Sequence, residues 1–139
     1  MKTMKLRNIG VTFLISLCPL IVTAQDEARI EALREIAQIV ASINHFPSAE
    51  NKAALAQIEG NESYPQGIRM LAATVANISH AANAEGKQSM TMLQNNQRAP
   101  DPVKSLAEII GRFNHMASEQ DKAALSFISL SWDGFRCLT

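Results

Sequence analysis

The sequence predicts an all-α protein made of three tandem 35-residue helical hairpins, six helices in all. The three histidines of the chain, His45, His80 and His115, follow one another at intervals of 35 residues. Around them, apolar residues recur at the spacing of a helix face, and the period-2 alternation typical of strands is missing. A repeat of this length is typical of stacked two-helix units.

The first 24 residues have the pattern of a cleaved signal peptide. A basic start is followed by an apolar run over 9–22 and by the small residues of Val22-Thr23-Ala24. This run is about 14 residues long, shorter than the roughly 20 that span a bilayer. We therefore expect export, most simply to a bacterial periplasm, and no stable membrane insertion after cleavage.

The remaining chain divides into one repeat domain and a short tail. We expect a helical-repeat domain over 25–131 and an apolar C-terminal tail over 132–139. The expected repeats cover about 26–60, 61–95 and 96–130. Cys18 leaves with the signal peptide, so Cys137 has no partner within the chain and could join two copies as a dimer.

A long helix is expected at the start of each repeat. Its apolar stripe recurs in all three copies, and Pro65 and Pro102 suit the first turn of a helix. The equivalent stripe positions are Leu33, Ile68 and Val103; Ile36, Leu71 and Leu106; and Val40, Val75 and Ile110. The pattern predicts long helices over 26–45, 65–80 and 102–115, each ending at its histidine.

A shorter second helix is expected after each histidine. Ser48, Asn83 and Ser118 are favourable N-cap residues, and acidic residues follow them in the first turn. These signals predict helices over 48–59, 83–95 and 118–131. A single hairpin cannot cover its own apolar face, so the three must pack together as a short α-solenoid or a compact helical bundle.

The histidines are the candidate metal ligands, but the predicted geometry favours a structural role. Ligating nitrogens must lie about 2 Å from one ion, whereas packed helices lie about 8–10 Å apart. Equivalent residues in a straight stack point in parallel, so His45, His80 and His115 are not expected to meet. Each is expected on the polar side of the last turn of its helix, bonding free carbonyls there. We therefore expect no metal and no other cofactor.

The function that this pattern favours is binding to another protein. The mature chain has 10 basic and 13 acidic residues, which argues against a nucleic-acid partner. It lacks a recognisable catalytic motif, so we expect no enzyme. The expectation is an exported accessory, chaperone-like or inhibitor protein. Trp132 and Phe135 are candidate partner contacts, unless the tail caps the third hairpin. The alternative is a small periplasmic metal-binding protein that uses the three histidines.

Overall fold

Six α-helices form the described part of the chain, residues 24–130 of a computed structural model. They are α1 (Ala24–Ser42), α2 (Ala49–Gly60), α3 (Gln66–Ala76), α4 (Ala84–Asn95), α5 (Asp101–Arg112) and α6 (Glu119–Leu130). The all-α prediction is confirmed. Over residues 24–130, each helix is too short or too polar to cross a membrane.

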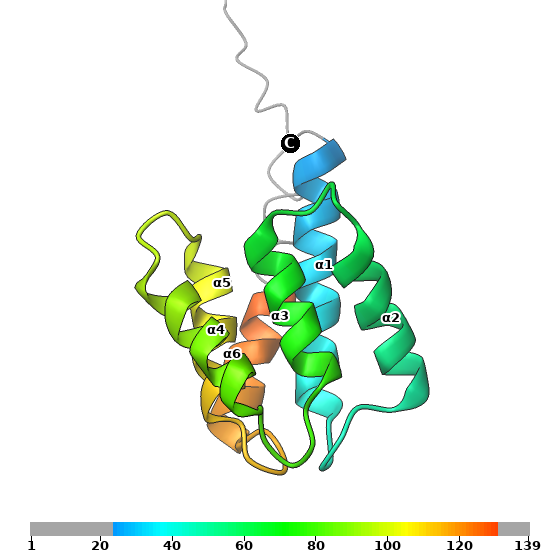
Figure 1. Ribbon diagram of the computed structural model, residues 1–139, viewed down its shortest axis with the longest axis vertical. Helices are drawn as coiled ribbons and strands as arrows, with labels where there is room; N and C mark the ends of the chain where they lie inside the picture. Colours follow the sequence, from blue (N-terminus) through cyan, green and yellow to red (C-terminus); the bar gives the residue numbers. More distant parts are fainter. Residues whose placement is uncertain (1–23, 131–139) are drawn as a thin grey trace, which may run out of the picture.

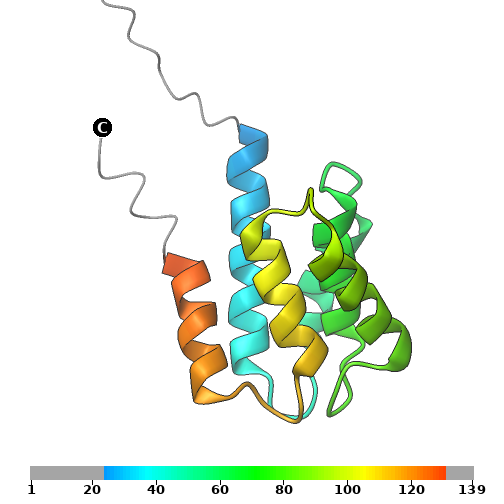
Figure 2. The same cartoon turned by 90° about the vertical axis from the view of Figure 1, so that its left-hand side faces the viewer.

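The helices pack in pairs, and the first and last helices close the structure. Helix α2 packs along α3, α4 packs along α5, and α6 packs along α1 (Figure 1). Figure 2 shows that the last helix, α6, lies beside the first helix, α1. Of the two expected packings, the structure is therefore the compact bundle, because an open solenoid leaves its terminal helices apart.

The closest helix pairs differ from the predicted hairpins. The expected hairpins paired α1 with α2, α3 with α4, and α5 with α6, but each close pair joins the second helix of one predicted unit to the first helix of another. The turns that fold the chain back are those before α3 and α5, where Tyr64 N donates to Asn61 O and Ala99 N donates to Asn96 O. The segments that carry the histidines do not close hairpins in this way, because the backbone groups of each histidine bond to the other two histidine segments.

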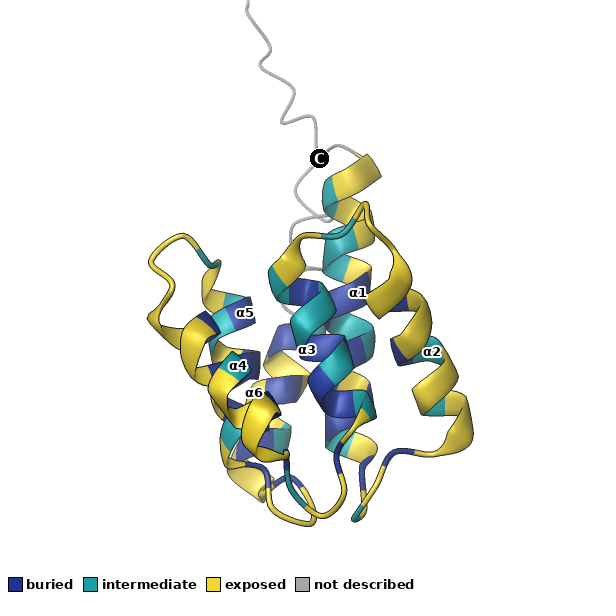
Figure 3. Cartoon of the chain, in the orientation of Figure 1, coloured by how far each residue is buried: buried dark blue, intermediate teal, exposed yellow. Residues whose placement is uncertain are grey.

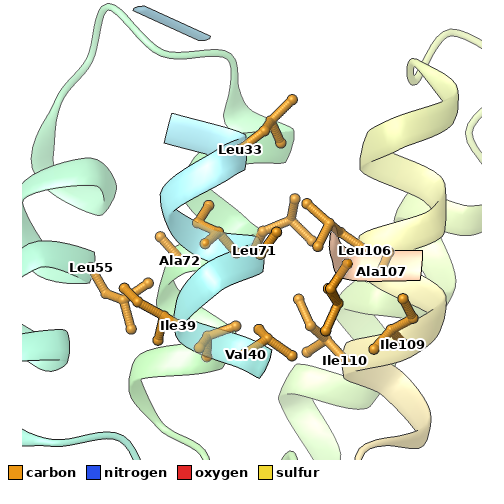
Figure 4. Packing of buried hydrophobic residues seen from close by; sticks show 14 of the residues in the cluster. Leu33, Ile39, Val40, Leu55, Leu71, Ala72, Leu106, Ala107, Ile109 and Ile110 are labelled. Atoms are coloured by element: carbon orange, nitrogen blue, oxygen red, sulfur yellow. The ribbon is translucent and has the colours of Figure 1, made fainter. Parts of the chain in front are cut away.

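The predicted apolar stripes form the core. Ile36, Leu71 and Leu106 are fully buried, and Val40, Val75 and Ile110 form a second buried layer. Figure 4 shows side chains of α1, α3 and α5 meeting between these helices, and Figure 3 shows that the outer surfaces of the bundle are exposed. Each large side chain contributes about 1.5–3 kcal/mol when it is fully buried.

The predicted N-caps are confirmed. Ser48 Oγ accepts from Asn51 N at 3.1 Å, Asn83 Oδ1 accepts from Gly86 N at 2.7 Å, and Ser118 Oγ accepts from Asp121 N at 3.1 Å. These bonds satisfy amides that a helix leaves free in its first turn. Helices α2, α4 and α6 therefore begin one residue after Ser48, Asn83 and Ser118. The prediction that they are shorter than their partners is wrong except for α1, because they have 12 residues each, whereas α1 has 19, α3 has 11 and α5 has 12.

The first helix of each predicted unit ends earlier than predicted. Helices α1, α3 and α5 stop at Ser42, Ala76 and Arg112, so the histidines lie in the connecting segments and not in the last helical turn. Each segment has a buried residue on either side of its histidine: Ile43 and Pro47, Ile78 and Ala82, and Phe113 and Ala117. Between them, the three histidines bond to one another through their backbone groups.

Candidate metal centre

The three histidine segments meet at one end of the bundle and form a closed ring of backbone hydrogen bonds. His45 N donates to His115 O at 2.6 Å, His115 N donates to His80 O at 2.5 Å, and His80 N donates to His45 O at 2.6 Å. Figure 2 shows the connections after α1, α3 and α5 at the same end of the molecule. The ring uses the backbone donor and acceptor of every histidine, so it joins the three segments without help from their side chains.

All three histidines adopt a left-handed backbone conformation. Their φ angles are 73°, 67° and 64°, and no other residue of the described chain has a positive φ. This conformation is uncommon for residues other than glycine, although histidine adopts it more often than most. Such positions cost on the order of 1–3 kcal/mol each and cluster at functional sites. The side chain at each position must therefore be considered for a role of its own.

The three imidazoles surround a common point. Their ring centroids are 5.1, 5.2 and 5.3 Å apart, and their planes cross at 76–88°. One ring nitrogen of each histidine lies within 4.8 Å of the corresponding nitrogens of the other two. His45 is half-buried, whereas His80 and His115 are exposed. Solvent therefore reaches the group.

The prediction that the histidines cannot meet is wrong, and so is their placement in the last helical turns. In a straight stack of hairpins, which the prediction assumed, equivalent side chains would point in parallel. Because α6 packs against α1, the equivalent segments instead face one another around a closed ring. Because the histidines lie outside the helices, the 8–10 Å spacing of packed helices does not separate them.

Two asparagines orient two of the rings. Asn44 Oδ1 lies 2.6 Å from His45 Nδ1, and Asn114 Oδ1 lies 2.6 Å from His115 Nδ1. An amide oxygen only accepts, so each Nδ1 carries the proton and leaves the Nε2 lone pair free. This is the arrangement of metal-binding histidines, which donate their second nitrogen to an outer acceptor. Ser79 precedes His80 in the sequence, where Asn44 and Asn114 precede the other two histidines.

The spacing of the nitrogens is close to that of a bound ion. Three atoms at the corners of a triangle with sides of 4.8 Å lie about 2.8 Å from its centre, and a Zn–N bond is about 2.0–2.1 Å. Each nitrogen would therefore move inward by about 0.8 Å or less, which small side-chain rotations can supply. Three neutral imidazoles suit zinc, copper, nickel or iron better than calcium or magnesium.

Helices α5 and α6, which flank His115, are joined by a carboxylate. Asp121 accepts hydrogen bonds from Arg112 and, at 2.7 Å, from the Ser118 hydroxyl. Burial raises the pKa of Asp121, but the bonds from Ser118 and Arg112 and the charge of Arg112 outweigh it and hold this pKa below its usual 3.8. Asp121 thus fixes the position at which α6 begins after the ring.

The other candidates from the sequence are outside the described residues. These are Trp132, Phe135 and Cys137, together with residues 1–23 of the expected signal peptide, so their expected roles stay predictions. Asn44 and Asn114 had no expected role, although the dipeptide Asn-His occurs at both 44–45 and 114–115. That recurrence was the available signal, because an amide next to a histidine is a natural acceptor for Nδ1.

Comparison of the chain with protein-family models, with curated proteins and with solved structures gives no match.

Proposed function

We propose that this protein binds one first-row transition metal ion through His45, His80 and His115. The observation that carries the proposal is the convergence of one nitrogen from each histidine to within 4.8 Å. Three protein nitrogens leave at least one coordination position for water or another ligand. His80 and His115 are exposed, so the ion could enter and leave without unfolding of the bundle.

A purely structural role explains the side chains less well. The ring is built from backbone groups, which any residue other than proline would supply. Glycine adopts a positive φ without steric cost, so it would form the same ring with less strain. Three histidines at three strained positions are instead what a metal site requires, and Asn44 and Asn114 support it by fixing two rings.

The proposal includes the repeat and the export inferred from the sequence. We take the chain as three copies of a 35-residue unit wrapped around one axis, each contributing one ligand. The ring of hydrogen bonds, the positive φ angles and the three N-caps recur at this interval, which supports the repeat. We place the mature protein outside the cytoplasm, in a bacterial periplasm, and propose binding without a catalysed reaction.

Binding to another protein is a second candidate function. Phe127 and Leu130 of α6 are 72% and 66% exposed and lie three positions apart, on the same face of the helix. They precede the tail that contains Trp132 and Phe135. A partner that loses binding when Phe127→Ser is introduced, while zinc binding stays, would support this candidate.

Zinc titration of the untagged mature chain, residues 25–139, tests the metal proposal. With a chromophoric chelator as competitor, the wild type should take up one zinc ion per chain. Each of the variants His45→Asn, His80→Asn and His115→Asn should bind more than about 100-fold more weakly, beyond the loss typical of outer-shell changes. Asparagine also tolerates the left-handed conformation, so these variants should fold.

The control removes a carboxylate from the same end of the bundle. Glu50 lies in the first turn of α2 and is exposed, so Glu50→Gln should leave zinc affinity unchanged. Absence of stoichiometric zinc, copper, nickel or iron in the wild type would overturn the proposal. Equal binding by the wild type and all three histidine variants would do the same.

A further inference from the structure

An apolar cleft lies at the end of the bundle opposite the histidines. It has a volume of about 620 Å³, within the 300–1,000 Å³ typical of small-molecule sites. The first turns of α3 and α5, the first two turns of α1 and the last turn of α4 surround it. Since the histidines follow the other ends of α1, α3 and α5, the cleft and the imidazoles lie at opposite poles.

The floor of the cleft comes from equivalent positions of the three long helices. Leu33, Ile68 and Val103 line it and are almost fully buried, at 5%, 3% and 4% exposure. Met70 and Met92 also line it, and their flexible thioether chains can adapt to different apolar shapes. The cleft therefore has a buried apolar base that can receive the apolar part of a small ligand.

The charged side chains of the cleft favour an anion. Arg29 and Arg98 line it together with one acidic residue, Asp26, which already pairs with Arg29 at 3.1 Å. The Nε atom of Arg29 is buried without a hydrogen-bond acceptor in the described chain. The N-terminus of α3 also lies at the cleft and has neither a side-chain cap nor an acidic residue in its first turn, so its first amides add positive potential.

We propose that this cleft binds a single-chain amphiphile with an anionic head group, such as a fatty acid. The acyl chain would occupy the space above Leu33, Ile68 and Val103, and the carboxylate would lie at the rim with Arg29 and Arg98. This inference is independent of the metal proposal, because the cleft shares no residue with the histidine ring.

Calorimetric titration of the mature chain with myristate, below its micelle concentration, tests the proposal. One myristate should bind per chain, and tetradecanol should bind at least about tenfold more weakly because it lacks the charge. Ile30 lines the cleft and is half-buried, so Ile30→Glu should reduce myristate binding at least about tenfold. Arg98→Gln, in an exposed connection, should reduce it several-fold without affecting the fold.

The controls separate the cleft from unspecific association. Lys87→Gln removes an equal charge from an exposed position outside the cleft and should bind myristate like the wild type. Absence of binding, equal binding of tetradecanol, or unchanged binding by Ile30→Glu would overturn the proposal. Binding that appears only after removal of 131–139 would also overturn it, since the tail would then be the occupant. Zinc binding should be the same in all these variants.

Discussion

The two ends of the bundle are held together in different ways. At the histidine end, the three segments are tied together by backbone hydrogen bonds, and their side chains remain accessible. At the other end, the long helices begin around an apolar cleft that their side chains leave partly unfilled. Where backbone hydrogen bonds join the segments, the side chains remain available for a ligand. Where side chains join the helices, their packing determines the volume of the cleft between them. One fold can therefore offer a polar site and an apolar site along one axis.

A substitution in the core layer between the two ends should have the largest effect on the free energy of unfolding. Leu71 is fully buried and lies among the long helices, so Leu71→Ala should lower the free energy of unfolding by about 2–5 kcal/mol. Urea denaturation monitored by circular dichroism measures this. The control, Ala53→Ser at an exposed position of α2, should change it by less than about 0.5 kcal/mol. A Leu71→Ala loss below 1 kcal/mol would mean that the two ends share no continuous core.

Glycine at a ring position should separate stability from ligand binding. His80→Gly removes one ligand, so zinc affinity should fall by more than about 100-fold. It also relieves a left-handed conformation that costs about 1–2 kcal/mol, which offsets the lost ring contacts. The free energy of unfolding without metal should therefore change by less than about 1 kcal/mol. A loss above 2 kcal/mol would show that the imidazole holds the fold together.

The fold class and the core were predictable from the sequence, but the convergence of the three histidines was not. The stripe that includes Leu33, Leu71 and Ile110 depends on local periodicity, which the chain displays directly. Convergence of the histidines depends on the pairing of α1 with α6, which joins residues almost 100 positions apart. Helices α1, α3 and α5 also end before the left-handed residues, and these residues are histidines, whereas glycine or asparagine is the usual left-handed residue after a helix.

Removal of an asparagine next to a histidine should weaken zinc binding less than removal of the histidine itself. Asn44→Ala removes the acceptor at His45 Nδ1, so zinc affinity should fall about 10–100-fold. Ser79→Ala is the matched change in the second repeat and should have a smaller effect. Competition titration of both variants measures the difference. If the two losses are equal, the Asn44 hydrogen bond does not orient the ring.

The smallest effect is expected from acid, which should lower the free energy of unfolding by weakening the contact between α5 and α6. The pKa of Asp121 is lowered in the folded state, so its stabilising contribution is complete above its unfolded value of about 3.8. The contribution is lost as the pH falls through the folded pKa. Asp121→Asn should therefore destabilise the protein by less than about 1 kcal/mol at pH 7, since Arg112 is half exposed, and should reduce the loss of stability below pH 4. Urea denaturation at pH 3 and pH 7 tests this, and parallel pH curves for both proteins would contradict it.

X-ray absorption at the zinc edge of the loaded mature protein tests the central claim most directly. Because each histidine supplies one nitrogen, the spectrum should show three imidazole nitrogens at about 2.0–2.1 Å and one further oxygen or nitrogen ligand. In His80→Asn, the imidazole count should fall to two. A wild-type spectrum with one imidazole or none, or with six oxygen ligands, would contradict a site built by the three converging histidines.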